Sequence, residues 1–435
     1  MELVQSPAAA GFTEAAFARF LKGRDEPAWL TQRRREAFAR FQALPWPSAQ
    51  DEEWRRTDIR GFRLDAFSPP TAERTGSEAR FGILSQALDA QGVASVEHRD
   101  GGLARGADPV LPKGAILLDL AQAAREHPEL VKRHLFTQTI AGGDDVFAAL
   151  HAAFWTSGTL FYVPRGVELE APVLSAIGLS GGAVDLSHTL VVLEEGARAV
   201  FAREMASLEG ADAALHAGGL EITVAAGARL EMVDVQNWNQ ATWHFSHERA
   251  VLGRGATLNW TVGGLGGRLA RVNQEVVLDG SGSSARVNGV LFTTGRQHLA
   301  YSTRQDHRAP HTTSDLLYKG ALKDRSRIVW KGMIRVEKAG QRTDAYQRND
   351  NLILSDRARA DSIPGLEIEA NDVRCTHGAT AGRVDEDMIF YAQARAIPRA
   401  DAVRLIVQGF FANVLDRIGV EAARETLRDA VASQI

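Results

Sequence analysis

The sequence is poor in cysteine: among its 435 residues, Cys375 is the single one. One cysteine cannot form an internal disulfide, and one thiolate cannot by itself hold a metal cluster or a structural zinc ion. Because disulfides are typical of oxidising compartments, this scarcity favours the reducing cytoplasm. Any metal chemistry would need ligands from elsewhere.

Long apolar runs and a surplus of positive charge are also missing. No apolar stretch approaches the eighteen or so residues of a membrane-spanning helix. Residues 1–7, MELVQSP, lack the basic start and apolar core of a secretion signal. The formal net charge is -4, whereas non-specific nucleic-acid binding normally depends on excess lysine and arginine. We therefore expect a cytoplasmic protein that binds neither membranes nor nucleic acids.

Several motifs of catalytic sites are absent as well. The chain contains no Gly-Lys pair and therefore no P-loop, in which backbone amides and a lysine hold nucleotide phosphates. It contains no H-E-x-x-H or C-x-x-C motif. The glycine-rich stretch 263–267 lies between strand-like segments with no helix signal after it, so we interpret it as a loop.

Apolar periodicity divides the chain into three regions, 1–145, 146–380 and 381–435. In the first region, residues 12 to about 65 read as helical, and an amphipathic surface helix within them is predicted to end at Pro45 and Pro47. Its basic run, residues 33–35, is typical of a solvated helix face rather than of a nucleic-acid contact. Further on, residues 116–118 predict a short strand and residues 119–135 a helix.

Short apolar or alternating segments recur from about residue 158 to 375, separated by tight corners. The corner glycines Gly196, Gly227, Gly255 and Gly282 are 31, 28 and 27 residues apart, and the corner aspartates Asp324 and Asp356 are 32 apart. The gap of 42 from Gly282 to Asp324 predicts an insertion in one unit. Glycine and aspartate suit corners because they tolerate positive φ. The repeat predicts a mainly β fold, a right-handed parallel β-helix with helical segments at both ends; a β-sandwich or cupin-like barrel is the alternative.

The third region returns to helical periodicity. An apolar stripe follows Pro398, and residues 420–431 predict a final amphipathic helix. Such helices either pack on the chain's own core or form a docking surface for a partner, and the pattern favours neither. The residues that we assign to a docking surface are Asp401, Val403, Ile406, Phe410, Phe411 and Val414.

Potential metal ligands gather late in the coil region: His298, Asp306, His307, His311, Asp372, Cys375 and His377. Residues 297–314 show no regular period, and we favour structural or hydrogen-bonding roles for the first three histidines. Cys375 and His377 alternate, so on a strand both side chains point to one face. A protonated imidazole can activate a neighbouring thiol, but a buried, inert cysteine beside a satisfied histidine is the alternative.

Several segments resemble the family shared by SufB and SufD, the scaffold proteins of the SUF machinery that builds iron–sulfur clusters. They are residues 54–58, 162–167, 306–314, 318–320, 341–345, 349–355, 364–380, 390–391 and 395–397. The resemblance covers nearly the whole chain and is densest from 297 to 415. The Cys-Thr-His-Gly-Ala-Thr run at 375–380 is similar to the SufD branch, whereas the SufB branch has a Glu-His-Glu-Ala type of run there and generally more cysteines.

The resemblance implies a parallel β-helix between helical ends and a scaffold that is not an enzyme by itself. It implies a heterodimer with a SufB-like paralogue through the last β-helix strands, and binding of a SufC-like ATPase to the C-terminal helices. By the same resemblance, His377 and Cys375 would face the partner where a cluster forms, with His377 as a metal ligand shared with that partner. A cluster would be transient there, and the chain alone would hold no cofactor stably.

Two alternative functions stay open. A homodimeric scaffold of the same family would use the same strands, because unpaired strand edges need covering in either case. A β-helix enzyme acting on polysaccharide would need paired carboxylates on successive coils, and the sequence offers no convincing set.

Overall fold

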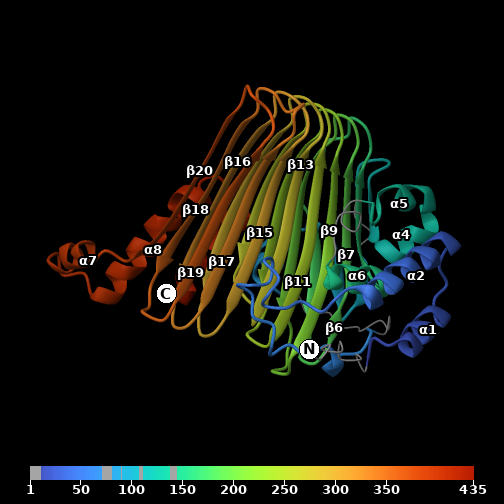
Figure 1. The fold of residues 1–435 in the computed structure, drawn as a ribbon, viewed down its shortest axis with the longest axis horizontal. Coiled ribbons are helices and arrows are strands. Elements are labelled where there is room, and N and C mark those ends of the chain that lie inside the picture. Colours follow the sequence, from blue (N-terminus) through green and yellow to red (C-terminus); the bar gives the residue numbers. More distant parts are fainter. Residues whose placement is uncertain (1–10, 71–80, 90, 107–110, 138–144) are drawn as a thin grey trace.

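The computed structural model describes residues 11–70, 81–89, 91–106, 111–137 and 145–435. Its centre is a β-solenoid of about eight turns built from two facing sheets, with helices at both ends of the chain (Figure 1). The predicted parallel β-helix with helical flanks is confirmed. Among the described residues, no helix is long and apolar enough to cross a membrane.

Each of the two sheets contains ten strands. The first sheet contains β1 (Ala94–Arg99), β2 (Gly102–Gly106), β5 (Val173–Leu179), β8 (Arg198–Ser207), β10 (Arg229–Asn237), β12 (Thr257–Gly264), β14 (Ser284–Thr293), β16 (Thr313–Leu322), β18 (Asp344–Ile353) and β20 (Arg374–Arg383). The second contains β3 (Ile116–Asp119), β4 (Gly158–Val163), β6 (Val184–Asp185), β7 (His188–Leu193), β9 (Ala214–Val224), β11 (Thr242–Leu252), β13 (Leu269–Leu278), β15 (His298–His307), β17 (Arg327–Val336) and β19 (Arg359–Ile368). In the second sheet, β6 pairs only with β9. From β8 and β9 onward each strand pairs in parallel with its counterpart in the next coil, so β20 and β19 end the two sheets.

Alternation along the strands separates the solenoid interior from its two outer faces. Inward side chains form apolar columns through successive coils, for example Trp260, Val287 and Leu316. Outward side chains of the first sheet pack instead on helices, as Val233 and Val290 do. Strands buried on both faces read as nearly continuous apolar segments, which explains the short apolar runs of the sequence.

Tight corners that link the second sheet to the first are stacked along the solenoid. Gly196, Gly227, Gly255 and Gly282 occupy these corners with φ between 64 and 71°, and each donates its backbone N–H to the next corner. His311 and Arg342 continue the same column at φ 58 and 60°. The predicted insertion is therefore wrong, because Asp324 and Asp356 belong to the other set of corners, before β17 and β19.

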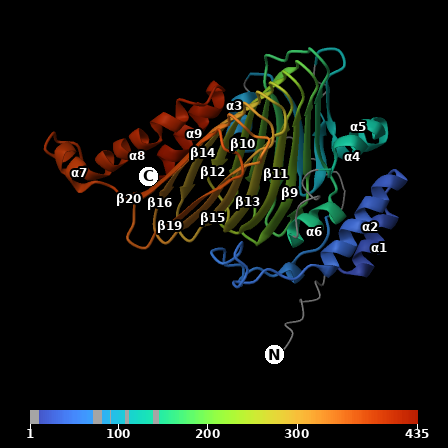
Figure 2. The same ribbon diagram turned by 45° about the horizontal axis from the view of Figure 1, so that its top comes forward.

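Helices cover both outer faces. On the second sheet, α1 (Glu14–Lys22), α2 (Ala28–Ala43) and α6 (Val146–Phe154) share an aromatic core with the strands; α4 (Leu120–Glu126) and α5 (Pro128–His134) lie beside them. On the first sheet, α3 (Ile83–Asp89), α8 (Arg399–Leu415) and α9 (Glu421–Gln434) form a second core (Figure 2). The remaining helix, α7 (Glu386–Gln393), contacts α8 and lies away from the solenoid (Figure 1).

The boundaries differ from the sequence prediction in three places. The helical segment predicted for 12–65 is two helices, α1 and α2, followed by irregular chain and a 3-10 turn, Leu64–Ala66. The helix predicted for 119–135 is interrupted at His127, because Pro128 opens a new helix there. Solenoid strands also begin before residue 146, at β1, and continue past 380 to Arg383.

Candidate functional site

Cys375 and His377 lie on β20, the last strand of the first sheet, at the C-terminal end of the solenoid (Figure 1). One inward column of the first sheet runs Leu258, Ala285, Ser314, Ala345, Cys375, and the next runs Trp260, Val287, Leu316, Gln347, His377. Both side chains therefore occupy interior positions of the last coil, which no other coil of the described residues covers. This is why His377 is exposed although Gln347, its counterpart in the preceding coil, is completely buried.

Cys375 is a free thiol that is half-buried at this end. It packs against the small apolar cluster that ends the interior, formed by Ile334, Val336, Ala345 and Ala370. Burial raises its pKa, and the carboxylate of Asp344 acts in the same direction. The thiol is therefore protonated at neutral pH in the isolated chain. A protonated, half-buried thiol is typical of an inert cysteine rather than of one activated by a neighbouring imidazole.

The interior behind His377 is lined by amides rather than by charged groups. The Asn351 amide donates to Asn349 Oδ1 at 2.7 Å, and the Ser362 hydroxyl donates to the same oxygen at 2.6 Å. Gln347 donates its amide N–H to the carbonyl of Gly365 at 3.0 Å. The bonds from Gln347 to Gly365 and from Ser362 to Asn349 join β18 to β19 across the interior, beneath the strand that carries the two site residues.

The rim of the open end is partly apolar. Leu366 and Ile368 on β19 are interior positions in register with buried Ile334 and Val336, yet they are 38% and 41% exposed. Exposed apolar side chains that cluster in this way are a common feature of interaction surfaces.

The other predicted ligands do not gather into one site. Residues 298–307 form β15, so the absence of a regular period in 297–314 was misleading. Burial lowers the pKa of His298 and of His307 to about 4, and His307 is hydrogen-bonded to Thr312 at 2.7 Å and Ser314 at 2.9 Å. His311 is a corner residue, as described above.

The two aspartates of that set have structural partners. Asp306 is buried and forms an ion pair with Arg308 at 2.9 Å, and exposed Asp372 lies 3.6 Å from Arg342. In the part of the chain that the structure describes, no group of three His, Cys, Asp or Glu side chains has the geometry to hold a metal ion. Of the first three histidines, His307 is the one for which these contacts include side-chain hydrogen bonds.

A buried charged network lies deeper in the interior, and the sequence analysis missed it. Arg203 donates to Asp234 at 2.9 and 2.7 Å and to Glu248 at 2.7 Å. Burial raises the pKa of Glu248, and the negative charge of Asp234 raises it further. The sequence does show a charged residue at an inward position in each of three strands, β8, β10 and β11. It does not show that these three residues pair, because their pairing depends on how the strands stack.

Histidines form a second enclosed network beside the first. His216 lies 3.3 Å from the carboxyl of Asp185 and 2.8 Å from His244, which accepts a hydrogen bond from the Trp238 indole at 3.1 Å. Burial lowers the pKa of His244 to about 3 and raises that of Asp185 to about 6. These groups are all fully enclosed, so they stabilise the interior and present no surface for binding.

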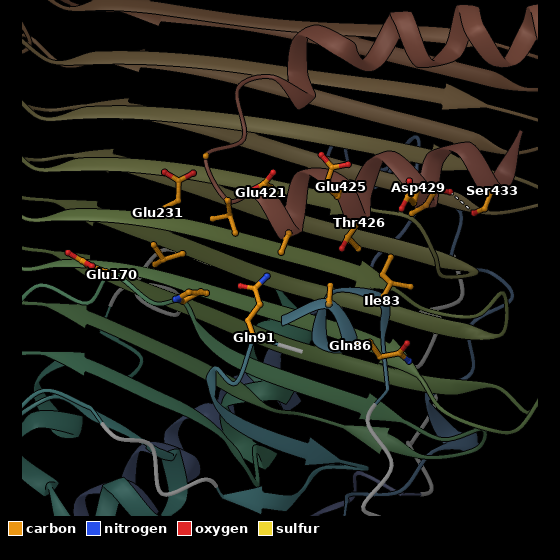
Figure 3. A pocket seen from close by; sticks show the side chains of 17 residues that line it. Ile83, Gln86, Gln91, Glu170, Glu231, Glu421, Glu425, Thr426, Asp429 and Ser433 are labelled. Carbon is orange, nitrogen blue, oxygen red and sulfur yellow. Dashed lines mark hydrogen bonds between the residues drawn. The ribbon is translucent and has the colours of Figure 1, made fainter. Parts of the chain in front are cut away.

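A large groove lies on the outer face of the first sheet, where α3 and α9 pack (Figure 3). It has a volume of about 1050 Å³, and its ionisable lining residues are Glu170, Glu231, Glu421, Glu425 and Asp429. Asn259 donates to Glu231 at 3.0 Å, and Arg428 lies 2.5 Å from Glu425. The groove contains neither Cys375 nor His377, and several of its carboxylates already have partners.

Residues 178–182, Gly-Leu-Ser-Gly-Gly, match the letters of the G-x-S-x-G nucleophile elbow, in which a serine sits on a strand-to-helix turn. In this chain they lie between two strands, β5 and β6. The Ser180 hydroxyl donates to Asp100 at 2.9 Å and its backbone N–H donates to the same carboxylate at 2.7 Å. Ser180 therefore ties two turns together and does not have the setting of an elbow nucleophile.

The C-terminal helices place the predicted docking residues in different environments. Phe411 and Val414 are fully buried against the first sheet, Val403, Ile406 and Phe410 are half-buried, and Asp401 is exposed. Phe411 and Val414 therefore do not form a docking surface, because they belong to the chain's own core. Exposed apolar side chains instead lie on α7 and α8: Met388, Phe390, Tyr391 and Leu405, which we call the α7–α8 patch.

Comparisons with known proteins agree with these features. Two family models match: the SUF system FeS cluster assembly, SufBD core domain, over residues 177–410, and the SufBD protein N-terminal region over residues 98–174. The chain is 31% identical over 416 residues, 92% of each chain, to an iron–sulfur cluster assembly SufBD family protein of Mycobacterium tuberculosis. It is 24% identical over 430 residues, 96% of this chain and 92% of the other, to one of Staphylococcus saprophyticus. None of these matches supports the polysaccharide-enzyme alternative.

Proposed function

The chain belongs to the SufBD family of iron–sulfur cluster assembly proteins, and on that premise we propose that it is a SufD-type scaffold subunit, not an enzyme by itself. It would pair with a SufB-like paralogue at the open end of its solenoid and bind a SufC-like ATPase through its C-terminal helices. The cluster is the cargo of this assembly, formed transiently between the two scaffold chains.

The observation that carries this proposal is the incomplete ligand set at the open end. The coil end presents one exposed imidazole, His377, and one half-buried thiol, Cys375, whose pKa is raised. Clusters and metal ions are held by several thiolates, imidazoles or carboxylates, so this pair alone is too small a set. A partner that covers the apolar rim would bring the remaining ligands next to His377.

The second contact, with the ATPase, is proposed at the α7–α8 patch. Its side chains are the most exposed large apolar groups of the described residues, and Phe390 is 73% exposed. The patch lies on α7, which is held away from the solenoid strands, and on the neighbouring part of α8 (Figure 1). This location replaces the buried part of the docking surface predicted from the sequence.

The test of the scaffold role is a His377→Ala variant, produced with the SufB-like and SufC-like proteins of the same genome. We expect the complex to assemble normally and cluster maturation in cells to be lost, because a ligand is missing while the strand is intact. Thr376→Ala, on the opposite face of the same strand, is the matched control and should mature clusters normally. Normal maturation by His377→Ala would remove this residue from the mechanism.

A further inference from the structure

Another pocket lies at the end of the solenoid opposite β20, between the loop that joins α1 to α2, the strand β2 and the helix α4 (Figure 1). Its volume is about 550 Å³, in the range of pockets that hold small molecules. Neither Cys375 nor His377 lines it, so it is separate from the proposed cluster site. We infer that this pocket binds the phosphate group of a small molecule, with Arg24 and Arg125 as the cations that hold it.

Arg24, in the loop between α1 and α2, is a half-buried cation without a counter-ion. Within the described residues its guanidinium forms neither a hydrogen bond nor an ion pair, and it lies 4.1 Å from the centroid of the Phe20 ring. Burial lowers the pKa of Arg24, although the charges of Glu26 and Asp119 act in the opposite direction. The protein therefore does not fully compensate this charge, and an anion in the pocket would do so.

The carboxylate of Glu26 is held by a different arginine. Arg34 donates from Nε to both of its oxygens, at 3.0 and 2.9 Å, and from Nη1 to the carbonyls of Ala153 at 3.2 Å and Trp155 at 2.8 Å. Burial lowers the pKa of Arg34 to about 9, and the positive charge of Arg24 acts in the same direction. Two neighbouring guanidinium groups thus have one carboxylate between them, which leaves a place for a second anion.

The other polar groups at the wall of the pocket also lack acceptors. The indole N–H of Trp155 and the hydroxyl of Ser157 are buried and have no hydrogen-bond partner in the part of the chain that the structure describes. Arg125 of α4 is exposed at the pocket and forms no ion pair with any described residue. A water molecule can accept such hydrogen bonds, but only an anion also balances the guanidinium charge.

Three carboxylates line the same pocket, and two of them have partners. Glu26 is engaged as described above, and Asp119 accepts the backbone N–H of Gln122 at 2.9 Å and lies 3.3 Å from His98. The third, Asp25, is exposed and forms no ion pair within the described residues. Its charge opposes an anionic ligand, so its removal should strengthen binding, which gives the inference a test with the opposite sign.

Phosphate is the anion that suits this set of donors best. A phosphate ester has three terminal oxygens where a carboxylate has two, and arginine binds phosphate through paired N–H groups. The volume of the pocket exceeds what phosphate alone needs, which leaves room for the organic part of an ester. The phosphate can come from the inorganic ion or from a small ester, and the two sources are distinguished by comparing both as ligands.

The test is isothermal titration of the full chain with inorganic phosphate and, separately, with glycerol 3-phosphate, at constant ionic strength. The variants are Arg24→Gln, Arg125→Gln and Asp25→Asn. Arg19→Gln, which changes an exposed arginine of α1 outside the pocket, is the matched control. Thermal unfolding of each variant shows whether it folds like the unmodified chain.

We expect Arg24→Gln to weaken binding of both ligands roughly tenfold, Arg125→Gln to weaken it to a smaller extent, and Arg19→Gln to leave it unchanged. Asp25→Asn should strengthen binding about twofold. Tighter binding of glycerol 3-phosphate would support an ester as the ligand, and equal binding the inorganic ion. Binding of neither ligand by the unmodified chain, or unaltered binding by folded Arg24→Gln, would overturn the inference and leave the scaffold role standing.

Discussion

At the scale of single residues, Asp185 shows how burial changes the pKa of a carboxyl group. Its carboxyl accepts hydrogen bonds from Ser187 and lies 3.3 Å from His216, and burial raises its pKa from 3.8 to about 6. Between these values the folded protein binds a proton that the unfolded chain does not. The unfolding free energy therefore falls as the pH rises from about 4 through 6, by up to roughly 3 kcal/mol.

Asp185→Asn tests this assignment. Asparagine keeps an acceptor for Ser187, offers an N–H to His216 and cannot ionise, so we expect the contribution of residue 185 to the pH slope to vanish. Urea unfolding at intervals between pH 4 and 7 measures the slope. Asp212→Asn, at an exposed position, is the control and should leave the slope unchanged. An unaltered slope in Asp185→Asn would show that other groups cause the pH dependence.

The sequence predicted some of these residue environments and not others. That Cys375 and His377 share a face followed from their spacing, since the strand period is local. Their different exposure did not, because it depends on the solenoid ending at β20. The ion-pair network around Arg203 could not be predicted from the sequence either, because it joins residues up to 45 positions apart.

At the scale of elements, the first turn of α3 is hydrogen-bonded to the solenoid through one carboxylate. Glu204 on β8 accepts the backbone N–H groups of Ile83, Leu84 and Ser85 at 2.7, 3.1 and 2.6 Å. These are N–H groups at the start of α3, which lack partners within the helix. A buried glutamate therefore caps a helix that precedes it by about 120 residues, an arrangement that no local capping pattern predicts.

Glu204→Ala should detach this helix end. It removes the acceptor of three N–H groups, and we expect the unfolding free energy to fall by about 1–3 kcal/mol. Chemical denaturation measures the loss, and faster proteolysis around residues 81–89 locates it. Glu168→Ala, which removes a surface ion pair with Arg198, should change stability by no more than about 0.5 kcal/mol. Equal effects in the two variants would contradict the capping role.

The α7–α8 patch gives a second prediction at this scale. Phe390→Ser combined with Leu405→Ser should weaken binding of the SufC-like ATPase at least tenfold, because both side chains are exposed and their loss leaves the core intact. Isothermal titration against the purified ATPase measures the affinity. Phe411→Ala is the contrasting variant: it should cost about 3–5 kcal/mol of stability, because this ring is fully buried. Unchanged affinity in the double variant would place the docking surface elsewhere.

At the scale of the whole molecule, the solenoid could be predicted because each coil repeats the local signals of the one before. Corner residues with positive φ recur at nearly constant spacing, and this recurrence compensates for the weakness of any single turn signal. Two sets of corners are interleaved in the sequence, however, and the pattern cannot tell them apart. The position of Asp324 was therefore read as an insertion, although it lies at the other corner.

The central claim is that this chain is one of two unlike solenoids in a cluster-assembly complex. Its most direct test is to tag the chain, express it together with the SufB-like and SufC-like proteins of its genome, and weigh what co-purifies. The account predicts a stable complex that contains both partners. A chain that emerges alone or only as a homodimer would contradict the heterodimer, and the ligands that complete the site at His377 would then have to come from a second copy of the same strand.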